Sequence, residues 1–228
     1  MGGIAPGVIL DVDGTLYSTS SACAVALRER HREIFVRTTG LDGDDGMREY
    51  ARLTDRYGLA LVGAAIVNGH DVDAVLGAAH DIDHATLIDP SPGLRRRLTE
   101  VPGPIIAWSN APSAHVEGVL VALGIRETID DVVPLERFRN HPKPSRRSFS
   151  VALEHLGRNP SQAVLFEDSP STLRRARELG MATVAIGLDA AMDYPDIDAA
   201  LDAPRVRGML GLGPPGVVSP PPPRPRER

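Results

Sequence analysis

Five short apolar runs constrain the fold of this chain more than any other feature of its sequence. They span residues 8–10, 105–108, 132–133, 163–166 and 183–186. Unbroken runs of this kind are typical of parallel strands that are buried on both faces. The last four alternate with segments of helical periodicity, a pattern that predicts a parallel sheet with helices on both faces. We therefore expect an α/β fold with a Rossmann-like parallel sheet at its core.

Residues 18–88, which lie between the first two runs, have helical patterns but no strand pattern. We expect four helices there, the first over residues 22–36 and the third over residues 59–68. Asp44 would cap the second helix and Asp71 the fourth. The expected buried stripe of the second helix consists of Met47, Tyr50, Ala51 and Thr54.

These patterns divide the chain into three parts. We predict an α/β catalytic core formed by residues 1–17 and 89–212, with an α-helical cap of residues 18–88 inserted into it. Residues 213–228 are rich in proline and arginine and show no apolar periodicity, so we expect a disordered tail there.

Composition excludes several classes of partner. The net charge of −5 argues against a nucleic acid polymer as ligand. No run approaches the ~20 apolar residues of a membrane-spanning helix, and the N-terminus lacks a secretory signal. The single cysteine, Cys23, fits a reducing compartment. We expect a soluble, cytoplasmic protein, monomeric or homodimeric.

Polar side chains follow three of the apolar runs. Asp11 and Asp13 follow the first, and strand periodicity starts them on the same side of the sheet. Ser109 and Asn110 follow the second run, and the pair at 167–168, Glu and Asp, follows the fourth. The carboxyl ends of parallel strands are where open α/β sheets place their ligands, so these groups predict one shared site.

Lys143 is the only lysine among the 25 Lys and Arg residues of the chain. It stands between two prolines, Pro142 and Pro144. Every other basic position of this kind in the chain is an arginine. The single lysine therefore indicates a site that requires a compact ammonium group.

The four motifs, in this order, resemble those of the haloacid dehalogenase superfamily. They are the segments 11–15 (DVDGT), 109–110 (SN), 143–144 (KP) and 167–168 (ED). The resemblance covers residues 8 to about 190. It implies a phosphomonoester hydrolase that forms an aspartyl-phosphate intermediate, and it implies that the helical insertion is a cap that closes over the site.

The resemblance also implies a role for each residue of the motifs. Asp11 would be the nucleophile, and Asp13 would protonate the leaving alkoxide and then deprotonate the hydrolytic water. Thr15 would help to hold Asp13 in position. The phosphoryl oxygens would be held by Ser109, Asn110 and Lys143.

Mg²⁺ is the cofactor that the resemblance implies. Asp11, the backbone carbonyl of Asp13 and Asp168 would bind the ion, and Glu167 would support it directly or through water. A cation is needed because a carboxylate that attacks a phosphate dianion meets like-charge repulsion.

Segments of the insertion and of the residues that follow it are similar to the pyrimidine 5′-nucleotidase branch of this superfamily. These segments are residues 57–63, 70–73, 80–83 and 89–95. We therefore predict that the substrate is a small phosphorylated molecule, a pyrimidine nucleoside 5′-monophosphate. The alternative is a phosphatase or mutase for another small phosphorylated metabolite, such as phosphoglycolate or a sugar phosphate.

Other activities of the same scaffold fit the sequence less well. A haloacid dehalogenase would not need Asp13 or the acidic pair at 167–168. A phosphonatase would need a lysine in the cap, and the cap has none. A binding protein without catalytic activity would have no need of the intact set of acidic residues.

His80 and His84 lie four residues apart, but no third metal ligand is evident, so we interpret them as polar residues at the foot of the cap. Tyr17, Tyr50 and Tyr57 fit two interpretations equally, facing a nucleotide base or packing between cap helices.

Overall fold

The computed structural model describes residues 4–139, 141–189 and 191–213. Within these residues a parallel five-stranded sheet has the order β3-β2-β1-β4-β5. Its strands are β1 (Gly7–Leu10), β2 (Ile105–Trp108), β3 (Asp131–Val133), β4 (Ala163–Glu167) and β5 (Ala182–Ala185). The expected Rossmann-like α/β core is confirmed, and each strand lies within about one residue of an apolar run.

Strand β1 lies at the centre of the sheet, where the strand order reverses. Leu10, its last residue, pairs with Ala107 on β2 and with Phe166 on β4. The polar residues that follow β1, β2 and β4 therefore leave the sheet side by side. Such a reversal point is where open α/β sheets bind their ligands.

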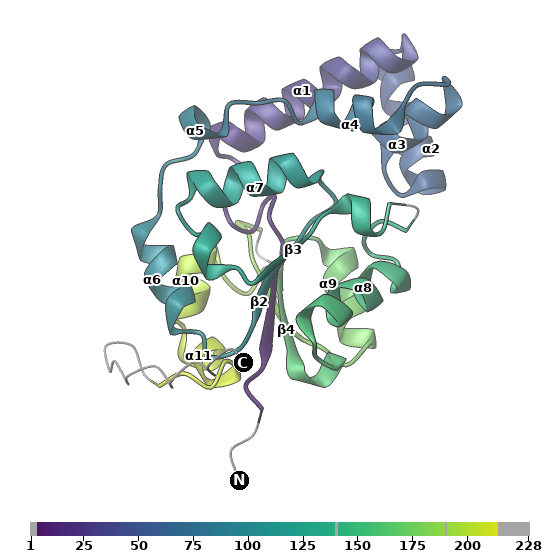
Figure 1. Ribbon diagram of the computed structural model, residues 1–228. Helices are drawn as coiled ribbons and strands as arrows, with labels where there is room; N and C mark the ends of the chain where they lie inside the picture. Colours follow the sequence, from purple (N-terminus) through teal and green to yellow (C-terminus); the bar gives the residue numbers. More distant parts are fainter. Residues whose placement is uncertain (1–3, 140, 190, 214–228) are drawn as a thin grey trace, which may run out of the picture.

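Helices cover both faces of the sheet (Figure 1). Val8 and Leu10 belong to one hydrophobic cluster and Ile9 to the other, as the period of two requires for a central strand. The first cluster includes residues of α6 (Pro92–Glu100), α7 (Ser113–Ala122), α10 (Ile197–Asp202) and α11 (Pro204–Met209). The second includes residues of α8 (Arg146–Leu156) and α9 (Pro170–Glu178). Short 3₁₀ helices occur at Arg126–Thr128, Leu135–Arg137 and Pro160–Gln162.

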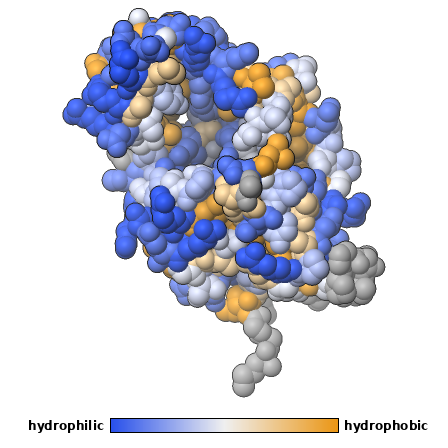
Figure 2. Space-filling view, turned by 180° about the vertical axis from the view of Figure 1, so that it is seen from behind, coloured by the Kyte–Doolittle hydropathy of each residue, from blue (hydrophilic) through white to orange (hydrophobic). Residues whose placement is uncertain are grey.

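The expected insertion, residues 18–88, is largely helical, with five helices where four were expected. It forms α1 (Ala22–Thr39), α2 (Gly43–Tyr57), α3 (Ala60–Val67), α4 (Val72–Ala79) and the single turn α5 (His84–Leu87). Figure 1 shows α1–α4 grouped beyond the carboxyl ends of the strands, with α5 above α7. Figure 2 shows a largely hydrophilic surface on this helical part and a hollow beneath it. Its assignment as a separate cap domain stays a prediction.

The prediction of which residues of α2 are buried is wrong. Met47 is 67% and Tyr50 43% exposed, whereas Leu53 is fully buried. The helix begins at Gly43 with Asp42, not Asp44, as its N-cap, and it packs mainly on α3. A helix at the edge of the molecule with one such neighbour buries only a narrow face.

Some elements were not expected from the sequence. Helix α5 has one turn, and α10 and α11 have six residues each, so none of them is long enough to display helical periodicity clearly. Of the expected tail, residues 214–228 lie outside the described part of the chain. Among the helices that the structure describes, none is both long and apolar enough to cross a membrane.

Candidate active site

Asp11 and Lys143 form a buried ion pair at the carboxyl end of β1. Their side chains are each 6% exposed, and Nζ of Lys143 lies 2.5 Å from Oδ1 of Asp11. The ammonium also donates to the carbonyl oxygen of Trp108 at 3.0 Å and to Oε2 of Glu167 at 3.2 Å. Three acceptors from three strand ends thus surround one compact cation. The structure brings the lone lysine to the first motif, 132 residues away along the chain.

Thr15 contacts a different carboxylate from the one we expected. Its Oγ1 donates to Oδ2 of Asp11 at 2.9 Å, so it supports Asp11 and not Asp13. The chain turns helically after β1, where the N–H of Leu16 donates to the carbonyl oxygen of Val12. In such a turn, residue 15 lies over residue 11, four positions earlier.

Asp13 is held by donors from three other positions. Oδ1 accepts from the Tyr17 hydroxyl and from Nε2 of His115, the latter at 2.6 Å, and Oδ2 accepts from the Ser109 hydroxyl at 3.2 Å. Burial alone would raise the pKa of Asp13, but the hydrogen bonds from His115 and Tyr17 outweigh it and hold the pKa well below its ordinary value. Without a substrate, Asp13 is therefore an ionised carboxylate and can act as a base. A phosphate dianion bound beside it would raise its pKa and favour the acid form.

The second motif contacts the rest of the site in two ways. The side-chain amide of Asn110 makes two hydrogen bonds with the backbone of Lys143. Oδ1 of Asn110 accepts from the N–H of Lys143 at 2.8 Å, and Nδ2 of Asn110 donates to the carbonyl oxygen of Lys143 at 3.3 Å. The Ser109 hydroxyl is next to Asp13 and also accepts from the N–H of Ala111. Asn110 therefore positions Lys143, and the expected contacts of both residues with phosphoryl oxygens stay a prediction.

Asp11, Glu167 and Asp168 each offer a carboxylate oxygen within 4.8 Å of the others. Oxygen ligands of this kind suit Mg²⁺, so the residues present fit the expected cofactor. Glu167 is largely occupied, since Oε1 accepts the N–H groups of Asp168 and Ser169. Each oxygen of Asp11 accepts a single hydrogen bond, from Lys143 or from Thr15, and so keeps capacity for a cation. Asp168 is the other candidate ligand. The cluster consists of side chains, so the carbonyl of Asp13 as a ligand stays a prediction.

The charges of this cluster do not balance. Burial raises the pKa of Asp11 to about 6 despite the opposing effect of Lys143, and burial together with the charge of Asp11 raises that of Glu167 to about 8. Burial alone would lower the pKa of Lys143, but Asp11 and Glu167 hold it above its ordinary value. Three carboxylates, with that of Asp168, face one ammonium. A bound divalent cation would offset the excess negative charge.

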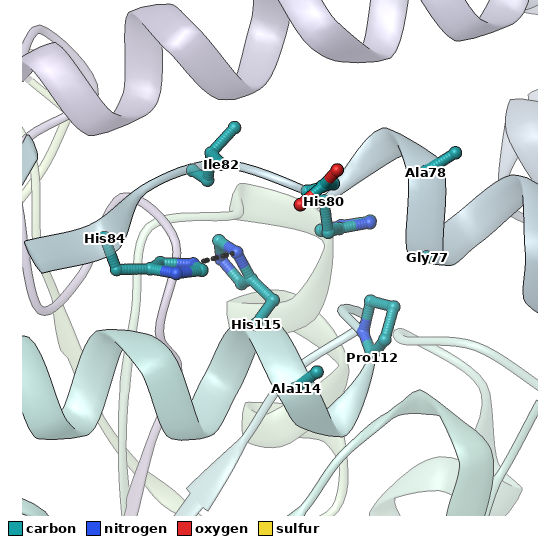
Figure 3. A pocket seen from close by; sticks show the side chains of 9 residues that line it. Gly77, Ala78, His80, Ile82, His84, Pro112, Ala114 and His115 are labelled. Carbon is teal, nitrogen blue, oxygen red and sulfur yellow. Dashed lines mark hydrogen bonds between the residues drawn. The ribbon is translucent and has the colours of Figure 1, made fainter.

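Histidines form a part of the site that the sequence analysis missed. His31, His80, His84 and His115 come from four helical regions and lie together beside Asp13. His80, His84 and His115 line a pocket of about 360 Å³ between the helical insertion and α7 (Figure 3). A second pocket of about 280 Å³ adjoins it and shares Gly77, Pro112 and Ala114. The spacing of His80 and His84 is visible in the sequence, but nothing there indicates that His31 and His115, which are 84 positions apart, join them.

Known proteins resemble this chain at the levels of sequence and fold. A validoxylamine A 7′-phosphate phosphatase from Streptomyces hygroscopicus subsp. limoneus is 26% identical over 185 residues, 78% of this chain and 84% of that protein. A fructose-1-phosphate phosphatase from Escherichia coli is 33% identical over 85 residues, 37% of this chain and 45% of that protein. The structure of a β-phosphoglucomutase from Clostridium difficile matches this chain with a TM-score of 0.63 at 17% identity. The match covers 91% of this chain and 98% of the mutase chain.

The family model for haloacid dehalogenase-like hydrolases matches residues 8–186, the span that contains the four motifs, β2–β5 and all of β1 except its first residue. The chain belongs to the haloacid dehalogenase-like hydrolase family.

Proposed function

We propose that this protein is a Mg²⁺-dependent phosphomonoester hydrolase that forms an aspartyl-phosphate on Asp11. The observation that carries the proposal is the environment of Asp11, which is buried beside Lys143 and two further carboxylates at the carboxyl end of the central strand. A nucleophilic carboxylate must be ionised and oriented, and Lys143 and Thr15 each hold one of its oxygens. The two curated relatives named above are both called phosphatases.

The reaction would proceed in two displacements at phosphorus. In the first, a carboxylate oxygen of Asp11 bonds to phosphorus, the ester P–O bond breaks, and Asp13 in its protonated form gives a proton to the leaving oxygen. In the second, water attacks phosphorus while Asp13 takes its proton, and the bond to Asp11 breaks. The products are an alcohol and inorganic phosphate, and Asp11 returns as a carboxylate.

The charged groups around Asp11 would bind the phosphoryl group. Lys143 is within reach of Asp11 and would hold a phosphoryl oxygen, and the Ser109 hydroxyl would turn from Asp13 to hold another. Mg²⁺ bound by Asp11 and Asp168 would neutralise charge between the phosphate dianion and the carboxylates.

For the substrate, we favour a small, polar phosphate ester of the sugar-phosphate class. The two adjoining pockets include charged and polar side chains but no phenylalanine, tyrosine or tryptophan. The polar members are Asp73, His80, Asp81, His84, Ser113, His115, Glu136 and Arg139. Neither pocket is lined by Asp11, Lys143 or Asp168, so the pockets give only the polar character of the neighbouring surface, and the names of the relatives carry the preference for a sugar phosphate.

The tyrosines that could have faced a base have other partners. Tyr17 donates to Asp13, Tyr50 packs against Phe35 with ring centroids 5.2 Å apart, and Tyr57 lies under the guanidinium of Arg56. The relatives' names specify a validoxylamine phosphate and a fructose phosphate. Pyrimidine nucleotides stay the competing prediction.

A substrate panel tests the proposal. Phosphate release should be measured with fructose 1-phosphate, glucose 6-phosphate, phosphoglycolate, uridine and cytidine monophosphates and p-nitrophenyl phosphate, with Mg²⁺ or EDTA. We expect activity only with Mg²⁺, sugar phosphates above nucleotides, and none in Asp11→Asn. A preference for pyrimidine monophosphates would replace the sugar-phosphate assignment with the nucleotidase one. Activity that survives EDTA or Asp11→Asn would refute the mechanism.

A further inference from the structure

Four of the seven histidines of this chain form one cluster behind Asp13. Their rings stack edge to face, with centroids 4.6 Å apart for His31 and His80, 5.1 Å for His80 and His115, and 4.9 Å for His84 and His115. His115 is 1% exposed and is the member that contacts Asp13. The cluster therefore connects the candidate acid–base residue to the helical insertion.

A continuous hydrogen-bond chain runs through two of these rings. Nε2 of His115 lies 2.6 Å from Oδ1 of Asp13, and Nδ1 of His115 lies 2.9 Å from Nε2 of His84 (Figure 3). An ionised carboxylate only accepts, so Nε2 of His115 carries a hydrogen. One hydrogen between Nδ1 of His115 and Nε2 of His84 links the two rings, whichever ring carries it. This contact holds the tilt of the His115 ring.

The two oxygens of Asp13 are held unequally. Oδ1 accepts from both His115 and Tyr17, whereas Oδ2 has only the longer contact of 3.2 Å with Ser109. Ser109 is an expected phosphate ligand, so Oδ2 is the oxygen on the side of the phosphoryl group. Oδ1 can accept the same two hydrogen bonds when Asp13 is protonated on Oδ2. The anchoring thus works for the acid and for the base form.

We propose that His115 is a positioning residue for Asp13, and that His84 acts through His115 to keep Oδ2 directed at the leaving oxygen. This inference rests on the proposed function, because it assigns a role in the proton transfers of that reaction. His84 begins α5, the turn between the helical insertion and the core, and α5 contacts both α1 and α7. The helical insertion thereby contributes to the orientation of the acid–base residue.

Gly118 provides a way to displace His84 without changing a titratable group. A Cβ at Gly118 would lie 2.6 Å from Nδ1 and 2.9 Å from Cε1 of His84. Alanine suits the interior of α7 better than glycine, by about 1 kcal/mol in an exposed helix, so the fold should tolerate the change. The ring of His84 would have to move away, and its hydrogen bond with His115 would be lost.

The experiment compares substrates whose leaving groups differ in their need for a proton. kcat and KM should be measured with p-nitrophenyl phosphate, whose leaving phenolate is stable, and with phenyl phosphate, whose leaving group needs protonation more. The variants are His115→Leu, His115→Gln, His84→Leu and Gly118→Ala. His155→Leu is the matched control, because His155 also pairs with a carboxylate, that of Asp131, but does so at the start of β3. Circular dichroism and melting temperature establish that each variant folds.

General acid–base catalysis supplies ~10²–10⁴-fold, and loss of orientation should remove part of it. We expect kcat of His115→Leu with phenyl phosphate to fall about tenfold more than with p-nitrophenyl phosphate, with KM nearly unchanged. His115→Gln keeps an N–H donor and should recover most of the loss. His84→Leu and Gly118→Ala should show smaller losses with the same substrate dependence, and His155→Leu none.

Equal losses with both substrates, or none in His84→Leu and Gly118→Ala, would overturn the inference and leave the proposed phosphatase function standing. A wild-type protein that hydrolyses neither ester with Mg²⁺ would instead refute the proposed function, and this inference with it.

Discussion

Gly14→Ala should damage the metal site through a steric contact. Gly14 has φ of +94°, and a Cβ there would lie 2.2 Å from Oδ2 and 2.8 Å from Cγ of Asp168. To restore an ordinary contact, the Asp168 carboxylate would have to move by about 1 Å. Metal–ligand distances tolerate about 0.2 Å, so the displaced carboxylate could no longer bind Mg²⁺ in its proper geometry.

The expected magnitude has two separable parts. The left-handed backbone should cost about 1–2 kcal/mol of folding stability for any residue with a Cβ. Displacement of Asp168 should weaken Mg²⁺ binding by about 10–100-fold, the range seen when the support of a metal ligand is removed. Gly124→Ala is the matched control, because Gly124 has φ of +71° but no atom within 4 Å of its Cβ position.

The assay is a Mg²⁺ titration of p-nitrophenyl phosphate hydrolysis, together with chemical denaturation in EDTA. Both variants should lose similar stability, but only Gly14→Ala should need more Mg²⁺ for half-maximal activity. If Gly14→Ala retains the Mg²⁺ dependence of the wild type, Asp168 is not a metal ligand, and our account of the acidic cluster is refuted.

Three further predictions concern charge and packing. Lys143→Arg should lower kcat/KM with p-nitrophenyl phosphate at least tenfold, although the positive charge is kept. The reason is that a planar guanidinium does not fit the compact position between Asp11 and Glu167. Near wild-type activity of this variant would contradict the prediction. In EDTA, thermal stability should fall as pH rises from about 6.5 to 8, because the raised pKa of about 8 for Glu167 makes the folded protein hold more protons than the unfolded chain. Below this range the lowered pKa values of His31 and His80 oppose the raised pKa of Asp11. Mg²⁺ should accordingly raise the melting temperature more at pH 8 than at pH 5, and an equal shift would count against the charge imbalance. Gly63→Ala should destabilise the fold by about 1–3 kcal/mol in denaturant titrations, because its Cβ would lie 2.6 Å from a ring carbon of the tyrosine that ends α2. Gly77→Ala is the control, because its Cβ would meet no atom within 4 Å, and it should not destabilise the fold. Equal effects of the two substitutions would refute the packing assignment.

The sheet and the meeting of the four motifs could be predicted because local pattern determines them. Each strand is an apolar run bounded by polar or turn residues, and a parallel sheet brings the carboxyl ends of its strands together. Asp11, Lys143 and Asp168 therefore converge as expected. The stripe of α2 could not be predicted in this way, because which face is buried depends on the neighbours of the helix, and only the packing of Leu53 against α3 reveals it.

The hydrogen-bond partners of individual side chains could not be predicted from the sequence either. Thr15 was assigned to Asp13 but donates to Asp11, because the helical turn after β1 determines which carboxylate it reaches. His115 and His84 contact each other across 31 positions, and nothing in the local sequence of either residue indicates the other. Long-range contacts between single polar residues leave no periodic signal.

The covalent intermediate is the central claim of this account, and Asp13→Asn allows it to be trapped. The variant lacks the base that activates water, so with p-nitrophenyl phosphate and Mg²⁺ the first displacement should outrun the second. We predict a burst of one p-nitrophenolate per protein molecule and, after acid quenching, a phosphoryl group on the peptide that contains Asp11, both absent from Asp11→Asn. No burst, or a phosphoryl group on another residue, would contradict the aspartyl-phosphate mechanism.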